Sequence, residues 1–166
     1  HVTWTFTLPI DLSSANLRIV NGKDRVAGAK YRRARDIAAG LMADAIVRTG
    51  AMPIQRGMTA ADVWRRRVAV TRLMGEKQRA FDDDGMVAAC KGLRDAMQRP
   101  RTYGKRIGAH VVQVPIAGAG IVWDDSAKWS EWRYAQERSA DGRPGVRVTI
   151  EDITIEPATS AREQGR

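Results

Sequence analysis

The stretch FDDDG at residues 81–85, which continues into Met86 to Met97, places three consecutive carboxylates directly before an apolar helix pattern. Apolar side chains then recur at the spacing i, i+4, i+7, i+11, which marks one face of a helix: Met86, Cys90, Leu93 and Met97. We therefore predict a core helix over Met86 to Met97. Asp84 is predicted at or near its N-cap, where backbone N–H groups and the helix dipole favour an ionised carboxylate.

A second acidic pair, Asp124-Asp125, follows the apolar run Ala119 to Trp123, which is predicted to be a buried strand. If Asp82 and Asp84 leave the end of an extended segment, their side chains share one side of it. The second pair would then bring a third carboxylate to the same end of the sheet. Close carboxylates repel one another unless a cation is present, and oxygen-only ligands select Mg²⁺ or Mn²⁺ over zinc. The pattern predicts a divalent-metal site.

Lys91 follows Asp84 by seven residues and is expected on the same helix face, about 10 Å further along. A helical lysine leans toward the helix N-terminus, so its ammonium group can approach the acidic cluster. The alternative is an ordinary exposed lysine that pairs with Asp95, four residues on. The acidic turn has an ordinary explanation too, because many Asp-rich turns are solvated loops that cap a helix.

At these residues the chain resembles the RusA-like Holliday-junction resolvases, which are crossover junction endodeoxyribonucleases of phage and prophage type. The resemblance covers roughly residues 3 to 151 and leaves 99–117 unmatched. It rests on these residues: Phe6-Thr7-Leu8-Pro9, Ser14-x-Asn16, Asp82-x-Asp84, Lys91, Leu93-x-Asp95-Ala96-Met97 and Gly120-Ile121-Val122-Trp123-Asp124-Asp125.

The resemblance implies that the metal-binding aspartates of the family correspond to Asp82, Asp84 and Asp125, with Asp124 as a weaker candidate. It implies that the catalytic lysine corresponds to Lys91. The implied cofactor is Mg²⁺, with Mn²⁺ as a substitute. The implied substrate is branched DNA in the form of a four-way junction, and two symmetric cuts imply a homodimer with paired active sites.

The chain departs from the family pattern in two places. Gly85 stands where the family usually has Asn after the second Asp. Lys91 lies one helical turn further along than the lysine of the best-known member. The second departure keeps the same helix face, so it weakens the lysine assignment more than the metal assignment.

Composition agrees with an anionic partner. The chain has 166 residues and a formal net charge of +9, and 22 of its 28 basic residues are arginine, which forms bidentate contacts with phosphate. A GC-rich genome explains part of this bias, but it does not explain why basic residues crowd the segments that flank the acidic turn. The predicted DNA-binding residues are Arg18, Lys23, Arg25, Lys30, Arg32, Arg33, Lys77, Arg79, Arg101, Lys105 and Arg106.

A single cysteine, Cys90, excludes a disulfide framework and a cysteine-based zinc site. No apolar run approaches the length of a membrane span. We therefore expect no membrane partner and a location in the cytoplasm of a bacterium or phage-infected host cell. The length predicts a single domain, which the resemblance implies is a RusA-like nuclease domain over residues 1–156, followed by a polar tail over 157–166.

The predicted fold is α+β: a mixed sheet of about four strands with two main helices on one face, in the order β-α-β-α-β-β. Gln98 to Gly118 is predicted to be a partly extended insertion that could reach DNA, with a surface loop of no role as the alternative. Thr59 and Asp62 have the spacing of a capping box in a short turn. The other predicted segments are a strand at Val2 to Leu8, a basic loop at Ile10 to Ala29, a helix at Lys30 to Arg48 and strands at Trp64 to Met74, Trp129 to Glu137 and Val146 to Ile150.

These observations lead to one main hypothesis and two alternatives. The first is a Mg²⁺-dependent, structure-selective DNA endonuclease that resolves four-way junctions by paired symmetric phosphodiester hydrolysis. The second keeps the fold but acts on flaps, forks or other branched DNA. The third is a non-catalytic DNA-binding or packaging accessory protein, which the two departures from the family pattern keep open.

Overall fold

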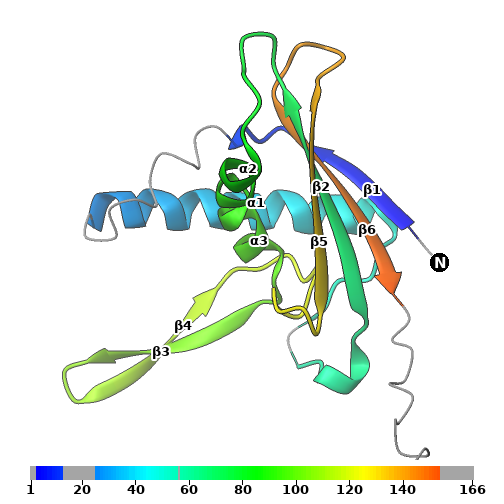
Figure 1. Cartoon of the computed structure of the whole chain (residues 1–166). Coiled ribbons are helices and arrows are strands. Elements are labelled where there is room, and N and C mark those ends of the chain that lie inside the picture. The colour runs from blue at the N-terminus through cyan, green and yellow to red at the C-terminus, as the bar shows by residue number, and fades with distance from the viewer. Residues whose placement is uncertain (1–2, 13–24, 56, 154–166) are drawn as a thin grey trace, which may run out of the picture.

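A mixed four-stranded sheet, with the strand order β1-β6-β2-β5, forms the centre of the molecule (Figure 1). The computed structural model describes residues 3–12, 25–55 and 57–153, with only the backbone described for 25–31. β6 pairs antiparallel with β1 and β2, whereas β2 and β5 are parallel. The strand bounds are β1 Thr3–Leu8, β2 Arg65–Met74, β5 Ser130–Arg138 and β6 Gly145–Ile153. The predicted α+β class with a mixed four-stranded sheet is confirmed.

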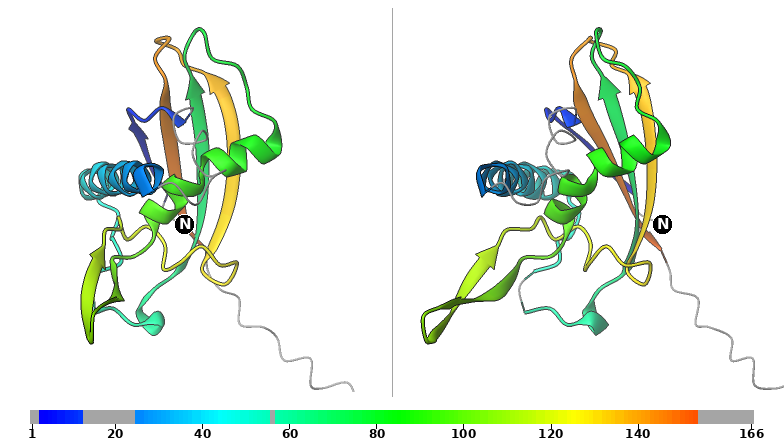
Figure 2. Two further views of the ribbon diagram at one scale, coloured as in Figure 1. Left: turned by 90° about the vertical axis from the view of Figure 1, so that its left-hand side faces the viewer. Right: turned by 60° about the vertical axis from the view of Figure 1, so that its left-hand side comes forward.

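Three α-helices cover one face of this sheet (Figure 2). They are α1 Arg25–Thr49, α2 Asp83–Ala89 and α3 Lys91–Met97. The core lies between the helices and the sheet, where apolar side chains of both layers are fully buried, among them Met42, Met97, Val68 and Val148. In β2 the burial alternates at every second residue, as expected for a strand with one covered face. Among the described residues, no helix is long and apolar enough to cross a membrane.

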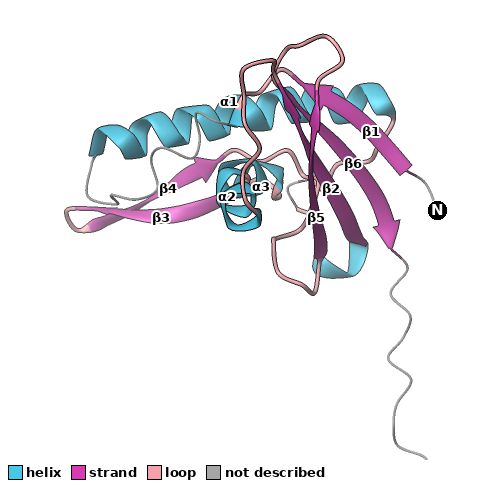
Figure 3. Ribbon diagram, turned by 45° about the horizontal axis from the view of Figure 1, so that its top comes forward, coloured by secondary structure: helices cyan, strands magenta, loops and turns pink. Residues whose placement is uncertain are grey.

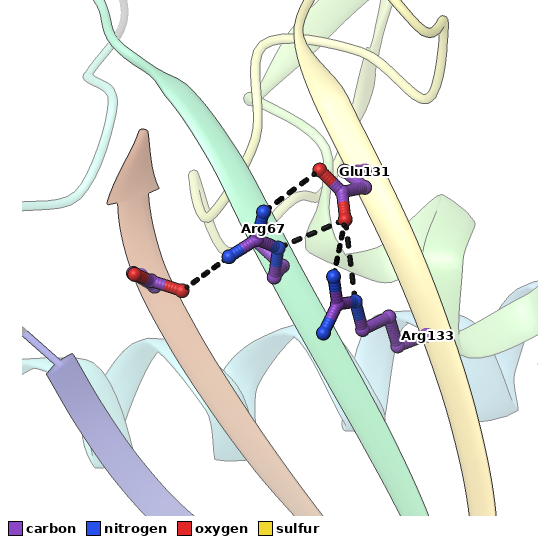
Figure 4. Close-up of polar contacts among 4 residues, drawn as sticks. Arg67, Glu131 and Arg133 are labelled. Carbon is purple, nitrogen blue, oxygen red and sulfur yellow. Dashed lines mark hydrogen bonds and ion pairs between the residues drawn. The ribbon is translucent and has the colours of Figure 1, made fainter. Parts of the chain in front are cut away.

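The uncovered face of the sheet carries charged side chains that pair across strands. Arg67 on β2 donates hydrogen bonds to Glu131 on β5 and to Glu151 on β6, each at 2.9 Å, and Arg133 also bonds Glu131 (Figure 4). The bonds from Arg67 lower the pKa of the Glu131 carboxyl below its ordinary value. This face is therefore a paired, solvated surface rather than a second core.

Helix α1 begins earlier than predicted. The loop predicted over Ile10 to Ala29 is wrong for its last part, because α1 starts at Arg25. Ala27 and Ala29 are strong helix formers and extend the helix through Gly28 and the basic residues. Residues 13–24 of the predicted loop, with Arg18 and Lys23, lie outside the described residues.

The predicted helix over Met86 to Met97 is divided in two at Cys90. The ladder of hydrogen bonds nevertheless continues across the division, because the Cys90 N–H donates to the Met86 carbonyl at 3.1 Å and the Arg94 N–H to the Cys90 carbonyl at 2.9 Å. The predicted apolar face is buried as expected. Burial raises the pKa of the Cys90 thiol to about 12, so this cysteine is a structural core residue.

The run Ala119 to Trp123 is buried as predicted up to Val122 and half-buried at Trp123, but it is not a strand of the sheet. Its backbone instead caps α3: the N–H of Ala119 donates to the Ala96 carbonyl, and those of Ile121 and Val122 donate to the Met97 carbonyl. The last carbonyls of a helix have no hydrogen-bond donor within the helix, and the N–H groups of this segment provide those donors. Gly120 has a φ of +70° and lies against the backbone of Ile54, so no larger residue fits there.

Two shorter features complete the fold. Asp62, in the 3-10 turn η3 Ala60–Asp62, accepts hydrogen bonds from the backbone N–H and hydroxyl of Thr59, so the predicted short turn is confirmed. The segment predicted as a partly extended insertion forms an antiparallel hairpin of β3 Arg101–Ile107 and β4 His110–Ile116. Both strands project from the domain, separate from the main sheet (Figures 1 and 3).

Candidate functional site

The acidic turn begins helix α2, and its first member is the helix cap. The Asp82 carboxylate accepts a hydrogen bond of 2.7 Å from the Gly85 N–H, so Asp82, rather than Asp84, is the N-cap. Asp83 and Asp84 lie exposed in the first helical turn. The predicted convergence of Asp82 and Asp84 on an extended segment is therefore wrong, because the chain is already helical at Asp83 and helix residues two apart do not face each other.

Gly85 lies close to the capping carboxylate. A Cβ atom at position 85 would lie 2.5 Å from the Asp82 carboxylate oxygen that accepts the hydrogen bond. A larger residue, such as the Asn of the RusA-like pattern, would therefore require the flexible Asp82 side chain to shift. The first departure from the family pattern thus lies beside a predicted metal ligand.

Gln136 on β5 forms hydrogen bonds with the backbone of Phe81, the residue that precedes Asp82. Its side-chain amide accepts a hydrogen bond from the Phe81 N–H and donates one to the Phe81 carbonyl, both at 2.9 Å. The Arg72 guanidinium lies 3.8 Å from the centre of the Phe81 ring and donates to the Gln136 amide oxygen at 3.1 Å. These contacts fix where α2 starts, and sequence analysis missed both Gln136 and Arg72.

Arg138 holds the loop between β2 and the acidic turn. One of its guanidinium nitrogens donates to the carbonyls of Gly75, Glu76 and Gln78. Lys77 and Arg79, both predicted to bind DNA, are exposed on this anchored loop. Lys77 and Arg79 precede Asp82 by five and three residues, and their role in binding DNA stays a prediction.

Asp125 is held on helix α3 by Arg94. A guanidinium nitrogen of Arg94 donates to the Asp125 carboxylate at 3.1 Å, and the same guanidinium lies 5.0 Å from the Trp132 ring. The Asp124 carboxylate instead accepts a hydrogen bond of 2.8 Å from the Ser126 N–H. Arg94 lies in the last turn of α3, where the helix dipole favours a cation.

A buried polar pair lies under this contact. The Arg94 Nε and the Tyr134 hydroxyl are both buried beside each other. Burial raises the pKa of Tyr134, so the phenol is neutral near pH 7. Arg94 was not among the predicted site residues. It could have been suggested by its position three residues after Lys91, because residues three apart are neighbours on a helix surface.

The acidic turn and Asp125 therefore lie at different points along the two consecutive helices α2 and α3, the first at the start of α2 and the second beside Arg94 of α3. Asp84 and Arg94 are ten residues apart, or about 15 Å along a continuous helix. Lys91 is exposed at the start of α3, between these points. Within residues 3–12, 25–55 and 57–153, no three His, Cys, Asp or Glu side chains are grouped so that they could hold a metal ion. The donor type of Asp82, Asp84 and Asp125 suits Mg²⁺, but Asp82 is engaged by the Gly85 N–H and Asp125 by Arg94, so a shared ion would require these carboxylates to rearrange.

The predicted DNA-binding residues fall into three groups. Arg32 and Arg33 are exposed on α1, Lys77 and Arg79 on the loop before α2, and Arg101, Lys105 and Arg106 on the β3–β4 hairpin. Arg25 and Lys30 belong to α1, but their side chains are not described. The first turns of α1 and the hairpin extend from the same side of the molecule (Figures 1 and 3). The basic groups on α1 and on the hairpin therefore lie on the same side of the molecule.

Fold and site together define an α+β domain with exposed carboxylates at a helix start, an arginine-held aspartate on the same helical unit and a basic hairpin. Comparisons with protein-family models and with the curated proteins found no match for this chain.

Proposed function

We propose that this protein is a Mg²⁺-dependent, structure-selective DNA endonuclease that resolves four-way junctions, as its resemblance to the RusA-like resolvases implies. The observation that carries the proposal is the Arg94–Asp125 ion pair. It attaches an aspartate from a distant segment to the helical unit that carries Asp84 and Lys91, which are two other residues of the family pattern.

Each of these residues has a proposed role. Asp82, Asp84 and Asp125 would hold Mg²⁺, or Mn²⁺ in its place, and the bound ion would supply an activated water and neutralise charge on the scissile phosphate. Lys91 would stabilise negative charge that develops on that phosphate. Asp125 must leave Arg94 to join the other two aspartates, and the released guanidinium would then be available to a DNA phosphate, which suits its planar fork.

DNA binding follows from charge. The exposed basic residues on α1, on the loop before α2 and on the hairpin would contact backbone phosphates, and binding through such contacts weakens steeply with salt. Two symmetric cuts in a four-way junction require two active sites, so we propose that the protein acts as a homodimer, in the cytoplasm of a bacterium or an infected host cell.

A second candidate is a non-catalytic DNA-binding protein of the same fold. One observation favours it: the Asp82 carboxylate is engaged as a helix cap. This hydrogen bond satisfies the aspartate within the protein itself. A chain that has lost affinity for the metal would be expected to keep such contacts.

An assay on three labelled DNA substrates tests the proposal. We expect the protein to cut a synthetic four-way junction in the presence of Mg²⁺, to cut a flap and a plain duplex of equal length much more slowly, and to cut nothing in EDTA. Binding of the junction without cleavage in Mg²⁺ would support the non-catalytic candidate. Equal cleavage of junction and flap would support a branched-DNA nuclease without junction specificity.

A further inference from the structure

In the described part of the domain, the strands of the β3–β4 hairpin pair only with each other. Every residue of β3 is exposed, and so are the first four residues of β4. The base of the hairpin is closed by a bridge between Gln98 and Val122 and by the Arg99 guanidinium, which lies 3.7 Å from the centre of the Trp123 ring. The ribbon is therefore held firmly at its base and projects freely beyond it (Figure 3).

The exposed surface of this ribbon is unusually apolar. Four large apolar side chains have these exposed fractions: Tyr103 46%, Ile107 55%, Val111 64% and Val112 45%. The strand register pairs Tyr103 with Val114, Lys105 with Val112 and Ile107 with His110, so Tyr103, Ile107 and Val112 share one face, whereas Val111 pairs with Arg106 on the other. An isolated two-stranded hairpin is at best marginally stable in water, and an exposed apolar face marks a binding surface. The hairpin is thus built to contact something else.

The charge of the segment identifies the kind of partner. No Asp or Glu occurs between Asp95 and Asp124, whereas the hairpin itself carries Arg101, Lys105, Arg106 and His110. Two copies of so basic a ribbon would repel each other if they packed face to face. A polyanion, by contrast, would be attracted over the whole length of the ribbon.

The dimensions of the ribbon fit duplex DNA. Each strand has seven residues, which gives the ribbon a length of about 24 Å. The major groove of B-form DNA, about 12 Å wide, admits a two-stranded ribbon, whereas the deep and narrow major groove of A-form RNA does not. The apolar side chains of the ribbon could then contact thymine methyl groups and sugars in the groove.

We propose that the β3–β4 hairpin is a DNA-binding arm that lies in the major groove of one duplex arm of the substrate, outside the catalytic site. Tyr103 and Val112 contact the floor of the groove. Arg101 and Lys105 on the same face, and Arg106 from the opposite face, contact the phosphates along its edges. This inference rests on the proposed function for the identity of the partner as DNA, but it does not need cleavage.

A binding experiment in EDTA tests the arm separately from catalysis. The full chain is titrated with a labelled four-way junction over a range of salt concentrations, and Lys105→Gln/Arg106→Gln is compared with wild type. We expect affinity to fall about tenfold near 0.15 M salt and the salt slope to fall by about two, one for each lost phosphate contact. The control variant Arg48→Gln/Arg143→Gln removes the same charge from exposed positions elsewhere and should bind within about twofold of wild type.

A second variant, Tyr103→Ser/Val112→Ser, tests the apolar contacts. We expect weaker junction binding with an unchanged salt slope, and an unchanged melting temperature because neither side chain belongs to the core. The arm is refuted if the basic variant binds as the control does, if an RNA duplex of matching sequence is bound equally well, or if hairpin variants alter only the oligomeric state. If the wild-type protein does not cut the junction in Mg²⁺ but these binding differences are observed, the nuclease proposal is refuted and the DNA-binding arm is still supported.

Discussion

Replacement of Asp82 by Asn is expected to lower the rate of Mg²⁺-dependent junction cleavage about 10³-fold and to leave the melting temperature unchanged. Asn is as good an N-cap as Asp, and its amide oxygen can accept the same hydrogen bond from Gly85. It lacks the charge with which a carboxylate holds a dication, and such an ion contributes several kcal/mol to catalysis, where about 1.4 kcal/mol corresponds to a factor of ten.

Two companion variants separate the two roles of Asp82. Asp83→Asn changes an exposed neighbour outside the predicted ligand set and should cleave within about twofold of wild type. Asp82→Ala removes the cap as well as the charge, so it should also lower the free energy of unfolding by about 1 kcal/mol. Junction cleavage that survives in Asp82→Asn at the wild-type rate would contradict the assignment of Asp82 as a ligand.

Replacement of Arg66 by Met is expected to lower the free energy of unfolding by about 3 kcal/mol. Only 2% of Arg66 is exposed, and its guanidinium bonds Asp152 at 2.7 Å and the carbonyls of Ile121 and Met52 at 2.8 and 2.9 Å. Met fills a similar volume but leaves both carbonyls without this donor. Urea unfolding at pH 7 measures the difference.

The neighbouring arginine provides the control for this stability measurement. Arg67→Met removes the ion pairs of the uncovered sheet face, where the Arg67 side chain is 29% exposed, and should cost less than about 1 kcal/mol. If Arg66→Met and Arg67→Met lower the free energy of unfolding by similar amounts, the burial of Arg66 does not make its contacts more stabilising than those of Arg67. Arg66 also ties β2 to the segment that leads to Asp124, so its loss should loosen that end of the candidate site.

The parts of the fold that depend on local periodicity were predictable from the sequence. The alternation in β2 and the i, i+4, i+7 spacing from Met86 fixed which face of each element is buried. The run Ala119 to Trp123 was predicted to be buried but was assigned the wrong structure. A short apolar run cannot reveal by periodicity whether it pairs in a sheet or caps a helix.

The site was less predictable, because its supports come from remote segments. Arg72 points into the core, where its partner Gln136 lies on a different strand, and a charged residue in a strand is ordinarily assigned to the solvent face. The Arg94–Asp125 pair depends on the fold in the same way. The cap at Asp82 could have been anticipated from residue type, since Asp is among the preferred N-cap residues.

A crystal of the protein soaked in Mn²⁺ tests the central claim most directly, namely that Asp82, Asp84 and Asp125 hold one dication between them. The account predicts an anomalous peak about 2 Å from carboxylate oxygens of all three residues, with the Asp125 side chain turned away from Arg94. A map without such a peak, in which Asp82 still caps α2 and Asp125 still pairs with Arg94, would contradict it.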